Sequence, residues 1–107
     1  MISVTIEKKD GQYRRLSCKG HAGYAKHGTD IVCAAASILV INTLNAIEEL
    51  TPTQFTADSD AKSGLIRADF TGQMTEGAVL LLDAMIMGLE GIEQEYGGKY
   101  IHLQVIG

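Results

Sequence analysis

Proline is scarce in this sequence, with one among 107 residues. A disordered or linker-rich chain would carry far more. The sequence also has no internal repeat, no low-complexity tract and no shift in composition that would mark a domain boundary. Because 46% of the residues are hydrophobic and the length is typical of one core, we expect a single domain over residues 1–107.

An excess of positive charge is also missing. Nine Lys and Arg residues stand against thirteen Asp and Glu residues, which gives a formal net charge of −4 at pH 7. A protein that grips a phosphate backbone needs a basic field. The two basic pairs, Lys8-Lys9 and Arg14-Arg15, flank a turn, and we interpret them as solvated hairpin ends. We therefore expect no direct contact with nucleic acid.

The sequence shows neither a leader nor a long hydrophobic run. The first ten residues, MISVTIEKKD, do not have the basic region followed by an apolar stretch that is typical of a signal peptide. The longest apolar run, residues 31–41, is interrupted by Ser37 and is too short to cross a bilayer. These observations predict a cytoplasmic protein without a membrane partner. In that compartment Cys18 and Cys33 are expected to be free thiols.

Alternation and turn signals predict the secondary structure. Residues 2–7 alternate between apolar and polar side chains, and Asp10-Gly11 is typical of a hairpin turn that leads into a strand at 13–20. The later predicted elements are a helix at 31–50, two short strands within 54–70, a helix at 74–96, and a strand at 100–106 that buries Ile101, Leu103 and Val105. The order ββαββαβ predicts the α+β class, with a mixed or antiparallel sheet covered by two helices.

Cys33 lies where a helix start favours thiol chemistry. Asp30 fits the N-cap of the helix at 31–50, which places Cys33 at the third helical position. The positive end of the helix dipole favours the thiolate, the form that attacks carbonyl carbons. We also expect N–H groups of this first turn to receive a developing oxyanion. His21, at the end of the preceding strand, is the candidate base, because the loop at 22–29 returns the chain to the helix.

Small residues and one hydroxyl accompany this pair. Gly20 and Gly23 leave room for a substrate backbone, and Ser37, one turn after Cys33, can position the sulfur or a water. Each residue also has a purely structural interpretation: the cysteine as a small core side chain, the histidine as a turn residue, and Asp30 as an ordinary cap. The pattern alone leaves these alternatives open.

A zinc site is a further alternative. Cys18, His21, His27 and Cys33 have a suitable composition. However, a strand that continues through His21 would point Cys18 and His21 to opposite faces, and the spacing matches no paired zinc motif. We therefore expect no metal and no cofactor, and interpret Cys18 as an inert buried thiol and His27 as a loop residue that touches substrate. The sequence also has neither a phosphate-binding glycine loop nor a serine in a Gly-x-Ser-x-Gly elbow.

The segment at residues 20–37 closely resembles the ribosomal-processing cysteine protease family, called Prp. The resemblance rests on Gly20-His21-Ala22, on the loop with its glycines, and on the run DIVCAAAS at residues 30–37, and it extends over the whole chain. It implies a bacterial cytosolic cysteine protease, typical of Firmicutes and their relatives, in which Cys33 is the nucleophile and His21 the catalytic histidine. The positions expected to support catalysis or bind substrate are Gly20, Ala22, Gly23, His27, Asp30 and Ser37.

The resemblance also implies a substrate and a partner. Members of the family remove a short N-terminal extension from ribosomal protein number twenty-seven of the large subunit. This extension is extended and hydrophobic, with aromatic residues before the scissile bond and a small residue after it. The family forms homodimers, and the loop at 22–29 matches a segment that orders around substrate. Two alternatives remain: a non-catalytic ribosome-assembly factor that binds the same extension, and another thiol enzyme such as an acyltransferase or thioesterase.

Overall fold

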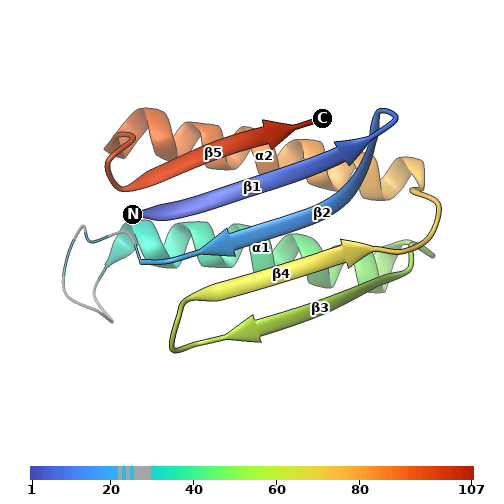
Figure 1. Ribbon diagram of the computed structural model, residues 1–107, viewed down its shortest axis with the longest axis horizontal. Helices are drawn as coiled ribbons and strands as arrows, with labels where there is room; N and C mark the ends of the chain where they lie inside the picture. Colours follow the sequence, from blue (N-terminus) through green and yellow to red (C-terminus); the bar gives the residue numbers. More distant parts are fainter. Residues whose placement is uncertain (22, 24, 26–29) are drawn as a thin grey trace.

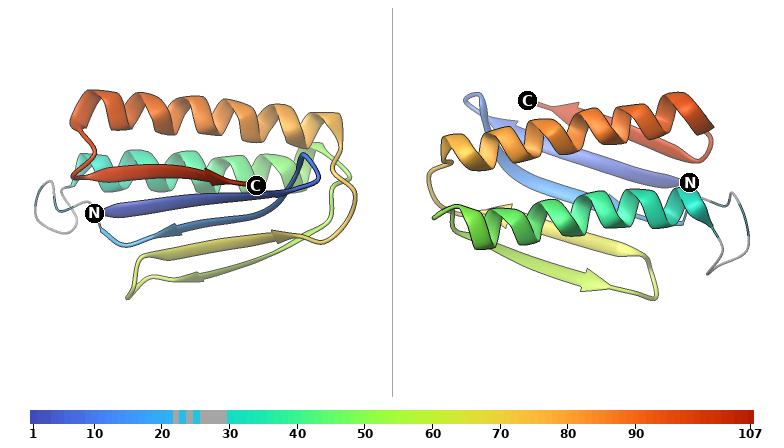
Figure 2. Two further views of the ribbon diagram at one scale, coloured as in Figure 1. Left: turned by 45° about the horizontal axis from the view of Figure 1, so that its top comes forward. Right: turned by 180° about the vertical axis from the view of Figure 1, so that it is seen from behind.

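The chain forms a mixed five-stranded sheet with both helices on one face (Figure 1, Figure 2). The computed structural model describes residues 1–21, 23, 25 and 30–107. The elements are β1 (Ile2–Lys9), β2 (Gln12–Lys19), α1 (Ile31–Leu50), β3 (Phe55–Asp60), β4 (Leu65–Phe70), α2 (Glu76–Tyr96) and β5 (Ile101–Ile106). The sheet order is β3-β4-β2-β1-β5, in which β1 and β5 are parallel and the other pairs antiparallel. The predicted α+β class and element order are confirmed.

The first hairpin follows from its turn residues. Asp10 and Gly11 have φ angles of 53° and 77°, which are left-handed values that a short side chain and a glycine tolerate. This turn pairs Val4 with Cys18 and Ile6 with Leu16 across β1 and β2. All four side chains are buried, so the helix-facing side of the hairpin is apolar, as the alternation predicted.

The core lies between the sheet and the two helices. Its largest fully buried side chains come from β1, β2, both helices and β5: Ile6, Leu16, Ile47, Leu82, Met85, Leu89, Ile101, Val4, Val32 and Val40. The helices approach closely where a Cβ on Gly88 of α2 would lie 2.9 Å from Cδ1 of Leu39 on α1. This small residue lets α1 and α2 pack closely side by side on the sheet.

Three details differ from the sequence prediction. β2 ends at Lys19 rather than at residue 20. α2 begins at Glu76 rather than at residue 74, because the Thr75 side chain caps it by accepting a hydrogen bond from the Ala78 amide. Of the three residues predicted to be buried in β5, Ile101 is buried, Leu103 is half-buried and Val105 is 50% exposed, because β5 is an edge strand that has a neighbour, β1, on one side only.

The apolar segment that forms α1 is longer than the run at residues 31–41 considered from the sequence. The helix has 20 residues, and an 18-residue window of it has a mean hydropathy of 1.8, so by length and composition it could cross a membrane, whereas residues 31–41 alone could not. Core helices of folded proteins pass the same test. In this fold, Val32, Ala36, Val40 and Ile47 of α1 are fully buried and belong to the core shared with the sheet.

The helices leave β3 partly uncovered. Figure 2 shows β3 at the edge of the sheet, beyond α1. Phe55 and Ala57 pair with Phe70 and Ala68, whose buried side chains face the helices, yet Ala57 itself is exposed. The result is a hollow between β3 and the second half of α1, lined among others by Ile41, Leu44, Phe55 and Ala57.

Candidate active site

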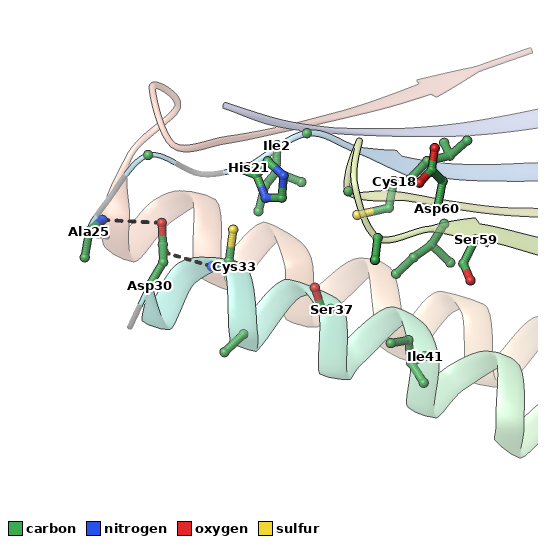
Figure 3. Close-up of a pocket in the computed structure, with 17 residues that line it drawn as sticks. Ile2, Cys18, His21, Ala25, Asp30, Cys33, Ser37, Ile41, Ser59 and Asp60 are labelled. Atoms are coloured by element: carbon green, nitrogen blue, oxygen red, sulfur yellow. Dashed lines mark hydrogen bonds between the residues drawn. The ribbon is translucent and has the colours of Figure 1, made fainter. Parts of the chain in front are cut away.

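Asp30 holds the start of α1. Its side chain is buried, and Oδ1 accepts hydrogen bonds from the amides of Val32 and Cys33, each at 3.0 Å. Oδ2 accepts a longer bond of 3.4 Å from the amide of Ala25, so the same carboxylate joins the preceding loop to the helix (Figure 3). The predicted N-cap is confirmed, with Cys33 as the third residue of α1.

The cap changes one expectation about oxyanion binding. The amides of Val32 and Cys33 donate to Asp30 Oδ1, and the amide of Ala34 donates to the Asp30 carbonyl at 3.1 Å. The prediction that N–H groups of this turn receive an oxyanion is therefore wrong for these three residues, because the cap already satisfies them. The helix start still provides the positive end of the helix dipole, and the Cys33 side chain lies in the first turn, close to it.

A cavity of about 650 Å³ lies beside this helix start, bounded by α1, the end of β2 and the β3–β4 turn. His21 and Cys33 both line it, so the fold brings together the two residues predicted to be catalytic. Figure 3 shows the Cys33 sulfur pointing from α1 into the cavity, toward the side on which the His21 imidazole lies. Cys33 is half-buried and His21 exposed, so a substrate can reach both side chains.

The predicted supporting residues that the structure describes all line the cavity. Ser37 lines the cavity one turn after Cys33, as expected (Figure 3). Gly20 also lines the cavity; it has φ +98°, and a Cβ there would lie 2.5 Å from the Met1 carbonyl oxygen, so its small size also allows the close approach of Met1. Gly23 lines the cavity with φ +73°, and its Cβ would meet nothing within 4 Å. Ala22 and His27 lie outside the described residues.

Cys18 also lies at this site, which the sequence did not reveal. It is 4% exposed and lines the same cavity as Cys33. Burial, and to a smaller extent the neighbouring Cys33, raise the pKa of the Cys18 thiol to about 11. A thiol with this pKa is almost fully protonated at neutral pH, which agrees with the interpretation of Cys18 as unreactive.

The structure does not place Cys18 and His21 on opposite faces of a strand, which was one reason given against a zinc site. That reason assumed that the strand continues through His21, but β2 ends at Lys19, and both Cys18 and His21 face the cavity. Within residues 1–21, 23, 25 and 30–107, no group of three or more His, Cys, Asp or Glu side chains is arranged to hold a metal ion. His27, the fourth candidate ligand, is not among these residues.

Sequence reasoning missed the β3–β4 turn. It read residues 61–64 only as a polar connection, whereas Asp60, Ala61, Gly64 and Leu65 line the cavity. A second hollow of about 300 Å³ lies between α1 and β3 and shares Ile41, Ser59 and Ile66 with the first. The two hollows therefore form one groove that leads away from Cys33. Gly64, the glycine in this turn, was the sequence signal that could have drawn attention to it.

Known proteins match both the sequence and the fold. A family model described as cysteine protease Prp matches residues 1–102. The ribosomal processing cysteine protease Prp of Staphylococcus aureus is 34% identical over 97 residues, which cover 90% of this chain and 92% of that protein. The protein of the same name from Bacillus subtilis is 32% identical over 101 residues, which cover 90% of each chain.

Solved structures agree with these matches. A crystal structure of an essential ribosomal processing protease Prp from S. aureus, in complex with a covalently linked product peptide, has a TM-score of 0.91 and 33% identity over 98% of this chain and 99% of that one. The S. aureus complex with a substrate peptide has a TM-score of 0.85 and 31% identity over the same shares. The fold and these matches define a cysteine protease. More narrowly, the chain belongs to the Prp family, as the resemblance implied.

Proposed function

We propose that this protein is an endopeptidase that removes the N-terminal extension of ribosomal protein number twenty-seven of the large subunit, using Cys33 and His21 as a catalytic dyad. The observation that carries the proposal is the shared cavity. It holds a thiol at a capped helix start and an imidazole within one accessible space. The relatives support the substrate class, since they are named ribosomal processing proteases and two S. aureus structures contain a product or substrate peptide.

The chemistry follows from the two side chains. The His21 imidazole accepts the proton of the Cys33 thiol, and the positive end of α1 stabilises the thiolate. The sulfur attacks the scissile carbonyl carbon and forms a tetrahedral intermediate. The imidazolium then protonates the leaving amine as the C–N bond breaks, which leaves a thioester on Cys33. A water molecule, deprotonated by His21, hydrolyses the thioester and restores the thiol.

Asp30 and Ser37 have supporting roles in this scheme. Asp30 keeps the first turn of α1 intact by holding the amides of Val32 and Cys33, so it fixes the direction of the Cys33 side chain. Ser37 lies one turn further along the same side of α1 and lines the cavity, where its hydroxyl can position a water for thioester hydrolysis.

The groove supports an extended, apolar substrate. It continues from the Cys33 cavity along α1 past Ile41 toward Leu44 and Phe55, and most of the surface of the first cavity is apolar. An extended peptide rises about 3.3 Å per residue, so a groove along several turns of α1 accommodates several residues on one side of the scissile bond. This length and character match a hydrophobic extension better than a single small acyl group.

The proposal also includes a cytoplasmic location, a homodimer, and no direct contact with nucleic acid or membrane. The net charge of −4 supports the absence of nucleic-acid contacts. Ile38 of α1 and Met87 of α2 support a dimer, because these large apolar side chains are 66% and 74% exposed on the helical layer.

Intact-mass spectrometry tests the function directly. The protein is incubated with the full-length ribosomal protein of the same organism, with its extension present, and Cys33→Ala and Cys18→Ala are run in parallel. One N-terminal cleavage by the wild type and by Cys18→Ala, but not by Cys33→Ala, is the expected result. Binding of the extension without cleavage by any form would instead identify an assembly factor. Alkylation-sensitive thioester hydrolysis without peptide cleavage would identify a different thiol enzyme.

A further inference from the structure

The β3–β4 turn makes an unusually close contact with the backbone that carries His21. Gly64 has φ +67°, and a Cβ built on it would lie 2.6 Å from the carbonyl oxygen of Gly20 and 3.1 Å from Cε1 of His21. A real Cβ atom essentially never lies within 3.0 Å of an atom in another part of the chain. The absence of a side chain at residue 64 is therefore what allows the turn to lie directly against residues 20 and 21.

Neither side of this contact can easily move away. Gly20 also lies close to Met1, because a Cβ at Gly20 would be 2.5 Å from the Met1 carbonyl oxygen, so Gly20 has little room to move toward Met1. The turn has a defined shape of its own, because the amide of Lys62 donates to the Asp60 carboxylate at 3.0 Å. A methyl group at residue 64 would therefore have to displace the Gly20 peptide, and the His21 side chain would move with it.

We propose that Gly64 is a positioning residue: by lying against Gly20 and the His21 ring, it sets the place of the imidazole relative to the Cys33 thiol. The inference rests on the proposed function, in which His21 is the base for Cys33. Gly64 itself touches no reacting atom in this account. Its effect is transmitted through the position of His21, and a misplacement of about 1 Å can cost a catalysed step about a hundredfold.

The chain offers a matched control in its other tight hairpin. Gly11, in the β1–β2 turn, has φ +77°, so a side chain there meets the same backbone strain as at Gly64. A Cβ on Gly11, however, would meet nothing within 4 Å. Gly64→Ala and Gly11→Ala therefore share the strain and differ in the displacement of His21.

Two readouts test the inference. For Gly64→Ala we expect kcat on the ribosomal protein precursor to fall by about 10- to 100-fold with KM changed less than about twofold, whereas Gly11→Ala keeps the kcat of the wild type. The NMR resonance of the His21 Cε1 proton, assigned with His21→Ala, is expected to shift in Gly64→Ala and to stay in place in Gly11→Ala. Because the resonance needs no substrate, it remains informative if the wild type cleaves nothing, in which case only the proposed function fails.

A second pair of variants covers the case in which Gly64→Ala does not fold. Asparagine adopts positive φ more readily than alanine but still carries a Cβ, so Gly64→Asn reduces the strain and keeps the clash. Gly64→Asn is then compared with Gly11→Asn by the same two readouts. An unshifted His21 resonance, or a loss of kcat equal in the Gly64 and Gly11 variants, would overturn the positioning role.

Discussion

Cys18 and Cys33 line one cavity but have opposite surroundings. Cys18 lies within β2, is 4% exposed, and has a thiol pKa raised to about 11 by burial. Cys33 lies in the first turn of α1, is half-buried, and points toward the side of the cavity on which His21 lies (Figure 3). The difference teaches that proximity to a site does not make a thiol reactive. A helix start, access to solvent and a base are also required.

Replacing His21, the proposed base, should have the largest effect, because it makes the reactivity of the Cys33 thiol most similar to that of the Cys18 thiol. With wild type at pH 8, we expect iodoacetamide to modify Cys33 at least about tenfold faster than Cys18, because a thiol of pKa 11 is about 0.1% ionised there. His21→Ala should slow the modification of Cys33 and lower kcat/KM by about 10²- to 10⁴-fold. Peptide mapping by mass spectrometry gives both rates of alkylation.

His102→Ala is the control for this variant. Nδ1 of His102 lies 3.4 Å from Oε2 of Glu93, and the His102 side chain is exposed on β5. We expect its replacement to leave both rates of alkylation and the cleavage rate unchanged. If His21→Ala behaves like His102→Ala, His21 is not the base.

Removing the Asp30 cap of α1 should have a smaller effect on activity than removing His21. Of the two thiols, it should affect only Cys33, which lies in the capped turn. Asp30→Ala exposes the amides of Val32 and Cys33, so we expect a loss of about 1 kcal/mol in the free energy of unfolding and an approximately tenfold loss in cleavage rate. Urea denaturation and the cleavage assay measure the two effects.

Thr75→Ala removes the equivalent cap from α2, where the Thr75 hydroxyl accepts from the Ala78 amide at 3.2 Å. It should cost a similar free energy of unfolding and leave cleavage at the wild-type rate, since α2 carries no predicted site residue. Equal losses of activity in both variants would mean that the cap of α1 acts only through global stability.

The last effect, on stability alone and not on cleavage at neutral pH, concerns the pH dependence of unfolding through Cys18. Its pKa in the folded state, about 11, lies above the ordinary value of 9.0, so the unfolded chain releases this proton first as the pH rises. The stabilisation is therefore complete below about pH 9 and is lost as the pH rises through about 11, by roughly 3 kcal/mol in total. Cys18→Ala should keep full cleavage activity at neutral pH and lack this decline.

The measurement is urea unfolding of the wild type and Cys18→Ala at pH 8 and pH 10.5. Tyr13 also has a raised pKa, because it is buried and donates a hydrogen bond to Asp83, but it is present in both proteins and cancels in the difference. Parallel declines in the two proteins would show that Cys18 does not carry the effect.

Local signals predicted much of the fold. The bounds of α1 are those expected from the sequence, because Asp30 caps its first turn and Pro52 follows its end. The β1–β2 hairpin follows from Asp10-Gly11 in the same way. In each case the residues that decide the structure are neighbours in the chain, so their chemistry can be read from the sequence.

Features that depend on distant contacts could not be predicted in this way. His21 faces the same cavity as Cys18 because β2 ends at Lys19, a boundary that the alternation of β2 does not define. Gly64 contacts His21 only because β4 pairs with β2, and the exposure of Val105 depends on β5 lying at the sheet edge. These are consequences of sheet order, which a single sequence constrains weakly.

The contact between Met1 and Gly20 has a practical consequence for protein production. Ile2 lines the cavity that holds Cys33 and His21, and the Met1 carbonyl oxygen lies against Gly20, directly before His21. A purification tag fused to the amino end would therefore emerge at the mouth of the cavity and compete with added peptide. The carboxyl end follows β5 to the opposite end of the sheet (Figure 1), so an affinity tag placed there leaves the cavity accessible.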